Sequence, residues 1–230
     1  MRFALLFFGF AVIGSASLTS AQDISGTTGT RLNHYATKKD INALRLEFAR
    51  CIASRFPKQA ADWLQSLPGT EEEASIIAKI ADPACYGTDH ILVDGTEISM
   101  NSMRVRFLVA QALVERKINT LPTALPQVTD KSWFDSKLAA AKNIHVDTLA
   151  LNLDDFGECL VKKDWGNSVA LLKARVNSSN ELTVVNLLVP QMGPCLAMQK
   201  LSIDRPMLRA AIASGIYHVA LAPSNAVVGN

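Results

Sequence analysis

Apolar residues recur every three to four positions along most of the chain, which is the spacing of an amphipathic α-helix. The first such helix is expected from about Lys38 to Phe56, with Thr37 as its N-cap. A second helix is expected after Pro57, and Pro68-Gly69 ends it. The pattern therefore predicts a mainly α-helical protein.

Two further helices are expected to begin at sequences of the same kind. Thr70 precedes Glu73 by three positions, and Ser178 precedes Glu181 by three positions. In such a capping box, the hydroxyl and the carboxylate each bind a backbone N–H that the helix start leaves without a partner. Because proline cannot continue a helix, both of these aliphatic helices are expected to stop at a proline. These prolines are Pro83 and Pro190.

Four cysteines mark out two similar segments of the chain. Cys51 and Cys85 are 34 positions apart, and Cys159 and Cys195 are 36 positions apart. Each first cysteine follows a phenylalanine by three positions, and each second cysteine follows a proline-containing turn. Four cysteines allow three pairings, and this spacing favours one disulfide within each segment. The two phenylalanines are Phe48 and Phe156.

A last helix is expected after the second cysteine of each segment, with Asn101 and Asp204 as the N-caps. The apolar faces of these two helices match in spacing, and Arg106 and Arg209 occupy equivalent places in them. Low residue identity leaves chance similarity as the alternative, but the shared order of features favours an internal duplication. An arginine at such a place binds an anion or holds a neighbouring helix end, and its presence in both segments favours the structural role.

The predicted fold is therefore mainly α, with two tandem helical repeats, each of about three helices and each held by one disulfide. Asp94-Gly95 lies between apolar flanks, which predicts a small β-hairpin in the first repeat. Leu149, Leu151 and Leu153 alternate with other residues, as in an extended strap or a helix start. The expected divisions are a signal peptide (1–21), a flexible segment (22–36), repeat 1 (37–118), a linker with a short helix (119–147), repeat 2 (148–223) and a flexible tail (224–230).

The first 21 residues have the organisation of a secretory signal peptide. Arg2 supplies a positive charge, and the run from Phe3 to Ile13 is apolar apart from one glycine. Cleavage is expected after Ala21 or, as an alternative, after Ala16. A membrane anchor is the competing interpretation, but the apolar run is shorter than the roughly 20 residues that span a bilayer. A periplasmic or secreted protein is predicted, in which the cysteines form disulfides.

Composition excludes several classes of protein. Of 230 residues, 49% are hydrophobic and 19% are charged, which is too apolar for a disordered chain. The formal net charge is +2, and loss of Arg2 with the signal peptide leaves +1. Nothing in the sequence resembles the concentrated basic surface of a nucleic-acid-binding protein. No membrane-spanning segment is expected after the signal peptide is removed.

Little in the sequence points to catalysis or to metal binding. The motifs of serine hydrolases, nucleotide-binding loops and zinc proteases do not occur in it. Asp154-Asp155 could pair with a distant carboxylate for acid–base chemistry, but these residues are expected to cap the helix that carries Cys159. The four histidines are dispersed, so neither a metal site nor a cofactor is predicted. They are His34, His90, His145 and His218.

The repeated pattern, a Phe-x-x-Cys string, a second cysteine after a proline turn and a final helix with an arginine, resembles a group of exported tandem-repeat proteins of Gram-negative bacteria. The resemblance extends from about Phe48 to His218. It implies a periplasmic or secreted location, and it implies no activity.

The predicted function is a non-catalytic module of the cell envelope that binds a peptide or another envelope protein. Helices with apolar faces and no cluster of polar residues suit packing and binding. The alternative is an exported hydrolase-type enzyme whose site assembles only in space, with residues from Asn119 to Leu153 as its source. A structural protein that acts through assembly is a third interpretation. No catalytic residue is assigned, and the oligomeric state stays open.

Overall fold

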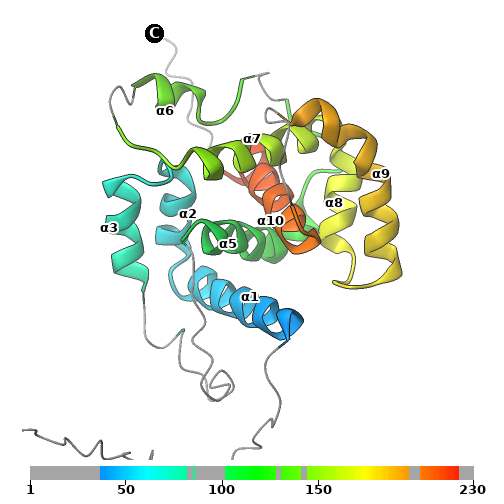
Figure 1. The fold of residues 1–230 in the computed structure, drawn as a ribbon, viewed down its shortest axis with the longest axis horizontal. Coiled ribbons are helices and arrows are strands. Elements are labelled where there is room, and N and C mark those ends of the chain that lie inside the picture. Colours follow the sequence, from blue (N-terminus) through cyan, green and yellow to red (C-terminus); the bar gives the residue numbers. More distant parts are fainter. Residues whose placement is uncertain are drawn as a thin grey trace, which may run out of the picture. The chain divides into compact units, whose positions relative to one another are not determined.

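The computed structural model describes residues 37–81, 85, 102–127, 131–140, 144–196 and 203–222. This part of the chain is mainly helical, as predicted, and contains no β-strand (Figure 1). The β-hairpin predicted at Asp94-Gly95, the signal peptide and the two flexible segments at the ends of the chain lie outside the described residues. The α-helices are α1 (Lys38–Arg55), α2 (Pro57–Gln65), α3 (Glu71–Ile80), α5 (Ser102–Lys117), α6 (Asp135–Ala140), α7 (Thr148–Lys163), α8 (Trp165–Lys173), α9 (Ser179–Cys195) and α10 (Arg205–Ile216).

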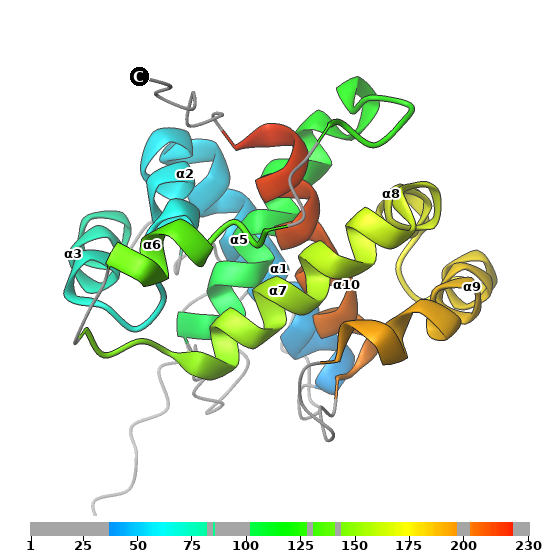
Figure 2. The same ribbon diagram turned by 90° about the horizontal axis from the view of Figure 1, so that it is seen from above.

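Four helices, α1, α5, α7 and α10, form the centre of this helical region. Helix α10 packs against both α7 and α5, and α5 packs against α1. Figure 2 shows α2 and α3 on one side of these helices and α8 and α9 on the other. One continuous apolar core includes buried residues from both cysteine-containing segments, such as Phe48, Phe107, Phe156 and Ile212. The two segments therefore share a core.

Helices α7 and α10 cross with their backbones in close contact, and this crossing depends on two glycines. A Cβ atom on Gly157 would collide with the backbone carbonyl of Ala211. A Cβ atom on Gly215 would lie 2.6 Å from the carbonyl carbon of Gly157, which is far inside van der Waals contact. The two backbones approach this closely because neither residue has a side chain at the crossing.

We expect Gly157→Ala to lower the free energy of unfolding by about 3 kcal/mol, because the added methyl forces α7 and α10 apart in a closely packed core. Urea unfolding followed by circular dichroism measures this loss. Gly166→Ala in α8 is the matched control, since the nearest non-neighbouring atom to a Cβ there, Asp164 Oδ1, lies 4.0 Å away and no proline follows it. The control should be neutral or stabilising by up to about 1 kcal/mol. Equal losses in both variants would contradict the crossing argument.

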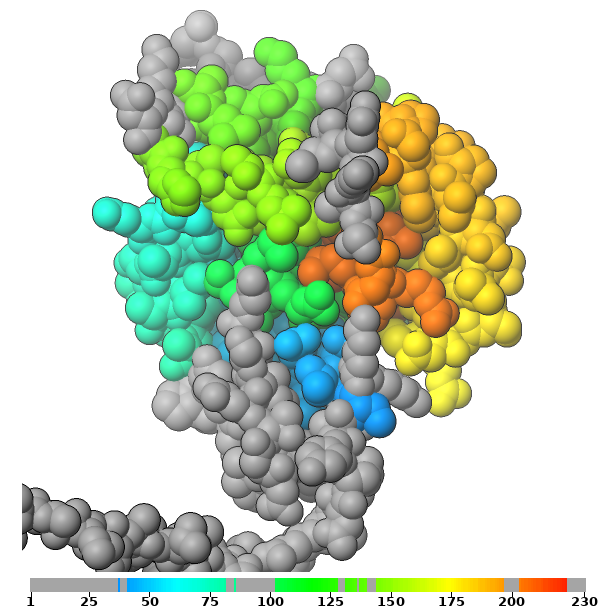
Figure 3. All heavy atoms as spheres, viewed as in Figure 1, coloured from blue at the N-terminus to red at the C-terminus, as the bar shows by residue number. Residues whose placement is uncertain are grey.

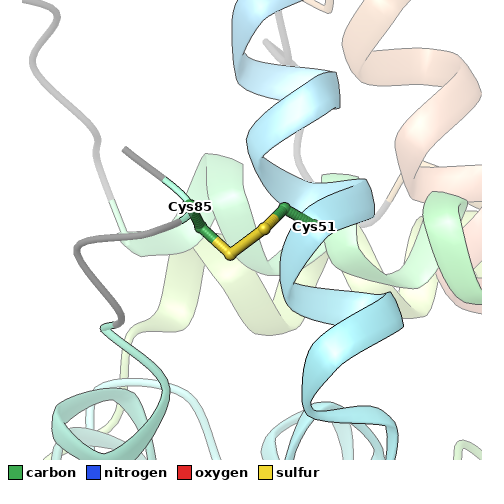
Figure 4. Close-up of a disulfide and its surroundings, with 2 residues drawn as sticks. All are labelled: Cys51 and Cys85. Carbon is green, nitrogen blue, oxygen red and sulfur yellow. A yellow bond between two sulfur atoms is a disulfide. The ribbon is translucent and has the colours of Figure 1, made fainter. Parts of the chain in front are cut away.

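Each segment contains one disulfide. Both bonds join the cysteines that their spacing in the sequence pairs. Cys51 of α1 is bonded to Cys85, as Figure 4 shows, and Cys159 of α7 is bonded to Cys195 at the end of α9. The Cα atoms are 5.6 Å apart in each bond. The described residues contain no free cysteine.

The expectation that Pro190 ends its helix is wrong. Helix α9 continues through Pro190 and Pro194 to Cys195. Proline deprives the carbonyl four residues earlier of its N–H partner. Here Pro190 and Asn186 are both exposed, so water can bind that carbonyl. The buried side chain of Leu188 and the disulfide at Cys195 hold the helix on both sides of this position. Helix α3 ends at Ile80, and Pro83 lies outside the described residues.

Candidate functional site

A groove with a volume of about 830 Å³ lies between α1, α5, α10 and the turn that joins α8 to α9. Figure 3 shows these segments as neighbours at the surface, with α1 in blue, α10 in orange and the α8–α9 segment in yellow. The volume is within the range of sites that bind small molecules or peptide side chains. Part of the wall is apolar and is formed by Leu46, Leu108 and Met207. Ala43 also lines the groove, and its small side chain leaves space on the α1 side.

A buried ion pair, Arg209 with Glu181, lines the groove. Arg209 Nη1 is 3.2 Å from Glu181 Oε1, and the two side chains are 5% and 4% exposed. The guanidinium also donates to the carbonyl oxygens of Leu171 and Leu172, at 2.6 Å each. Arg209 Nε has no hydrogen-bond acceptor within the described part of the chain. Burial lowers the pKa of Arg209, and the Glu181 carboxylate partly offsets that effect.

Further polar side chains line the groove, and several of them bind one another. Buried Gln111 donates to Glu115 at 2.8 Å, and Glu115 also accepts from Arg50 at 2.8 Å. The groove is also lined by three more arginines, Arg104, Arg175 and Arg205, and by one more carboxylate, that of Glu47. Because these arginines outnumber the carboxylate, they make the groove electropositive.

Arg106, on α5, makes the same kind of contact as Arg209. Its guanidinium donates to the carbonyl oxygens of Trp63, Leu64 and Ser66 at the end of α2, at 2.7 to 2.8 Å. It also donates to Glu73 Oε1 at 3.1 Å. Each arginine therefore binds the C-terminal carbonyls of one helix and the capping-box glutamate of the next. These contacts are structural, which is the role that the sequence favoured over anion binding.

The capping boxes form at both predicted positions. The hydroxyls of Thr70 and Ser178 accept from the backbone N–H groups of Glu73 and Glu181. Each glutamate carboxylate accepts from the residue before the cap rather than from the cap itself. Those two residues both have left-handed backbone, with φ of 80° and 62°. They are Gly69 and Asn177.

The expectation that Asp154-Asp155 caps a helix is wrong. Helix α7 starts at Thr148, and Asp147 is its N-cap, with hydrogen bonds of 3.0 Å from the next N–H groups. Because the helix starts early, the alternating leucines belong to its first turns, and Asp154 lies well inside it. Asp154 accepts from the Ser214 hydroxyl and lies 3.8 Å from Arg106 Nε.

A segment of the linker covers this buried carboxylate. Trp133 stacks on His218, with ring centroids 5.2 Å apart, and Phe134 meets the same imidazole edge-on. Phe134 is fully buried in a small apolar cluster with Leu67 and Leu151. The patterns in the sequence did not single out Trp133 and Phe134. Two adjacent aromatic residues, flanked on both sides by polar residues, were the signal that could have found them.

The cluster under this cover holds residue types found in hydrolases, but its geometry does not suit that chemistry. Ser214 donates to Asp154 and not to His218, whose Nε2 lies 4.0 Å from Asp154 Oδ1. Asp154, Ser214 and His218 are at most 5% exposed. Burial raises the pKa of Asp154 to about 6, and it lowers the pKa of His218 well below 6.5. A nucleophile would need access to substrate, and Ser214 is fully buried, with its hydroxyl bound to the Asp154 carboxylate and not to the imidazole.

Asp154 and His218 affect the pH dependence of stability in opposite directions. Because the pKa of Asp154 is raised from 3.8 to about 6, the native state binds this proton more tightly, and its contribution to stability is lost as the pH rises from about 4 to about 6. Because the pKa of His218 is lowered, the unfolded state takes up that proton first. Its contribution is lost as the pH falls below 6.5.

Of these two effects, Asp154→Asn removes the first and leaves that of His218. We therefore expect the stability of this variant to rise more steeply with pH than that of the wild type between pH 4 and pH 6. The two curves should diverge by about 3 kcal/mol over this window. Urea unfolding at steps of half a pH unit measures both curves. In His218→Gln the histidine effect is absent, so stability should rise less steeply with pH than in the wild type. Parallel curves for wild type and Asp154→Asn would contradict the assignment.

The other residues considered from the sequence do not gather at a site. His34 and His90 lie outside the described residues, and His145 is exposed. Among the described residues, no three His, Cys, Asp or Glu side chains are placed to hold a metal ion. None of the helices in the described ranges is both long and apolar enough to cross a membrane.

Comparison of the chain with protein-family models, with curated proteins and with solved structures found no match. The resemblance to exported tandem-repeat proteins therefore stays a prediction. Function has to be inferred from the geometry of the groove and of the buried cluster.

Proposed function

We propose that this protein is a non-catalytic module of the cell envelope that binds a peptide or a segment of another protein in the groove between α1, α5, α10 and the α8–α9 turn. The groove itself carries the proposal. Its volume of about 830 Å³ accommodates side chains of a ligand, and its walls combine apolar surface with polar groups. Buried Arg209 and Glu181 are held by each other and by the backbone, and buried Gln111 is held by Glu115, which favours a rigid binding surface.

Export to the periplasm or the medium is part of this proposal. Residues 1–21 have the pattern of a signal peptide. The disulfides Cys51–Cys85 and Cys159–Cys195 are of a kind that persists in oxidising compartments. The resemblance to exported tandem-repeat proteins of Gram-negative bacteria agrees with both.

We also propose that the chain is an internal duplication, in which α1, α2, α3 and α5 correspond to α7, α8, α9 and α10. Helices α2 and α8 are of equal length and start 108 positions apart. Helices α3 and α9 also start 108 positions apart. The two arginine contacts, the two capping boxes and the two left-handed residues follow the same correspondence. Where α7 and α10 cross at two glycines, α1 and α5 carry small buried residues, Ala49 and Ala112.

The hydrolase alternative gains no support from the buried cluster. Trp133 and Phe134 cover His218, and Asp154 and Ser214 are both buried. A substrate would have to displace this cover before it reached any of these groups. Binding in the open groove needs no such rearrangement.

The experiment is a selection from a random peptide display library on the mature, oxidised protein. Ala43→Trp places an indole in the groove, and Ala78→Trp, on the exposed face of α3, is the matched control. We expect peptides whose binding is lost in Ala43→Trp and kept in Ala78→Trp. If no selected peptide depends on Ala43, the groove is not the binding site. Turnover of substrates on a hydrolase panel would favour the enzyme instead.

A further inference from the structure

Under the proposed duplication, the groove has a counterpart between α7, α10, α5 and the turn that joins α2 to α3. Each wall of the groove corresponds to a wall of this second site. The turn after α8 corresponds to the turn after α2, and α1 corresponds to α7. The corresponding pairs of positions include Ala43 with Leu151, Leu46 with Asp154, Glu47 with Asp155, Arg50 with Glu158, and Arg209 with Arg106.

The counterpart site is filled by the chain's own residues, from Ser132 to Lys137. The Ser132 hydroxyl donates to Asp155, and the backbone N–H of Trp133 donates to Glu158 Oε2 at 3.0 Å. Phe134 is fully buried, and its ring centroid lies 5.8 Å from the guanidinium carbon of Arg106. The Lys137 ammonium donates to the carbonyl oxygen of Gln65 at the end of α2. The counterpart site thus holds a short segment of the chain itself, and an aromatic side chain of that segment anchors it there.

We propose that the groove binds a short segment of another protein in the same way, with an aromatic side chain over Arg209 and acidic residues beside it. This inference rests on the proposed function and on the duplication. The aromatic anchor follows from Phe134, which occupies the corresponding place over Arg106. Ala43 stands where the filled site has Leu151, so the open groove has more room for a bulky ring.

The acidic character of the ligand follows from charge. In the filled site, two carboxylates on α7 bind the segment: Asp155 accepts from the Ser132 hydroxyl, and Glu158 accepts from the backbone N–H of Trp133. A third carboxylate on α7, that of Asp154, lies beside Arg106. At the corresponding positions the groove has Leu46, Glu47 and Arg50, so two carboxylates are lost, and the arginine gained there is paired with Glu115. The groove also presents Arg104, Arg175 and Arg205. A ligand with carboxylates complements this surface, and a basic one does not.

The probes are synthetic peptides derived from residues 131–138, Lys-Ser-Trp-Phe-Asp-Ser-Lys-Leu. The acidic peptide has glutamate in place of both lysines. A second peptide keeps the glutamates and has serine in place of both aromatic residues, and a third keeps the original lysines. Fluorescence anisotropy measures the binding of each peptide to the mature, oxidised protein and to the Ala43→Trp and Ala78→Trp variants.

We expect the acidic aromatic peptide to bind at least about tenfold more tightly than the peptide without aromatic residues, since a buried ring contributes a large apolar area. It should also bind more tightly than the basic peptide, by a ratio that shrinks as salt is raised. Ala43→Trp should weaken its binding about tenfold or more, and Ala78→Trp should leave it unchanged. Equal binding of all three peptides, or binding that Ala43→Trp leaves intact, would overturn the inference.

Three further outcomes separate this inference from the proposed function. If the display library yields peptides that depend on Ala43 but carry neither aromatic nor acidic residues, the groove is a binding site and the inferred ligand class is wrong. If no peptide in either experiment depends on Ala43, both proposals fail. Self-association in sedimentation experiments that Ala43→Trp abolishes would identify the occupant as a second copy of this chain, which also overturns the inference.

Discussion

Arg106→Met is expected to lower the free energy of unfolding by about 3 to 5 kcal/mol, the loss that follows when one partner of a buried ion pair is removed. Arg106 is fully buried, and Glu73, its partner, is 5% exposed. The variant leaves the Glu73 carboxylate buried without its charge partner. It also removes the donors to three carbonyl oxygens at the end of α2. Each such group that is left without a partner costs free energy.

Urea unfolding followed by circular dichroism measures this loss, and two comparisons show its origin. Arg50→Met removes an ion pair with Glu115 in which the arginine side chain is 53% exposed, so it should cost at most about 1 kcal/mol. Adding Glu73→Gln to Arg106→Met should cost less than the sum of the single losses, because the unpaired charge is then gone. A loss below about 1 kcal/mol for Arg106→Met would contradict the structural role of this residue.

Loss of either disulfide is expected to lower the free energy of unfolding by about 4 kcal/mol. The bonds close loops of 34 and 36 positions, and restricting such a loop in the unfolded chain accounts for this magnitude. Because a domain is commonly stable by only about 5 to 15 kcal/mol, loss of both bonds should leave little or no folded protein. The pairs Cys51→Ala/Cys85→Ala and Cys159→Ala/Cys195→Ala test the two bonds separately.

If a single cysteine substitution lowers the free energy of unfolding as much as the corresponding double substitution, the loss comes from the disulfide bond and not from the individual side chains. Cys51→Ala and the double variant Cys51→Ala/Cys85→Ala should therefore unfold at similar urea concentrations. Wild-type protein that has been fully reduced should be the least stable form. If reduction changes stability by less than about 1 kcal/mol, the disulfides contribute little to the stability of either segment.

Several features were predictable because they depend on residues close together in the chain. Helical periodicity located most of the helices, and the capping boxes at Thr70 and Ser178 located two helix starts within a residue. The spacing of the cysteines pairs them as the structure does, since each bond joins two residues of one segment. Pro190 is the exception, because whether a proline ends a helix depends on what holds the helix beyond it.

The sites were decided only by the tertiary structure. Asp154 is a buried partner of Ser214 and lies near Arg106, although 48 to 60 positions separate it from them in the chain. The groove is formed by four segments that are distant in sequence, and its counterpart is closed by Trp133 and Phe134. Hydrophobic periodicity, caps and cysteine spacing specify local structure. They carry no information about which distant side chains meet, because packing and desolvation of the whole core determine those contacts.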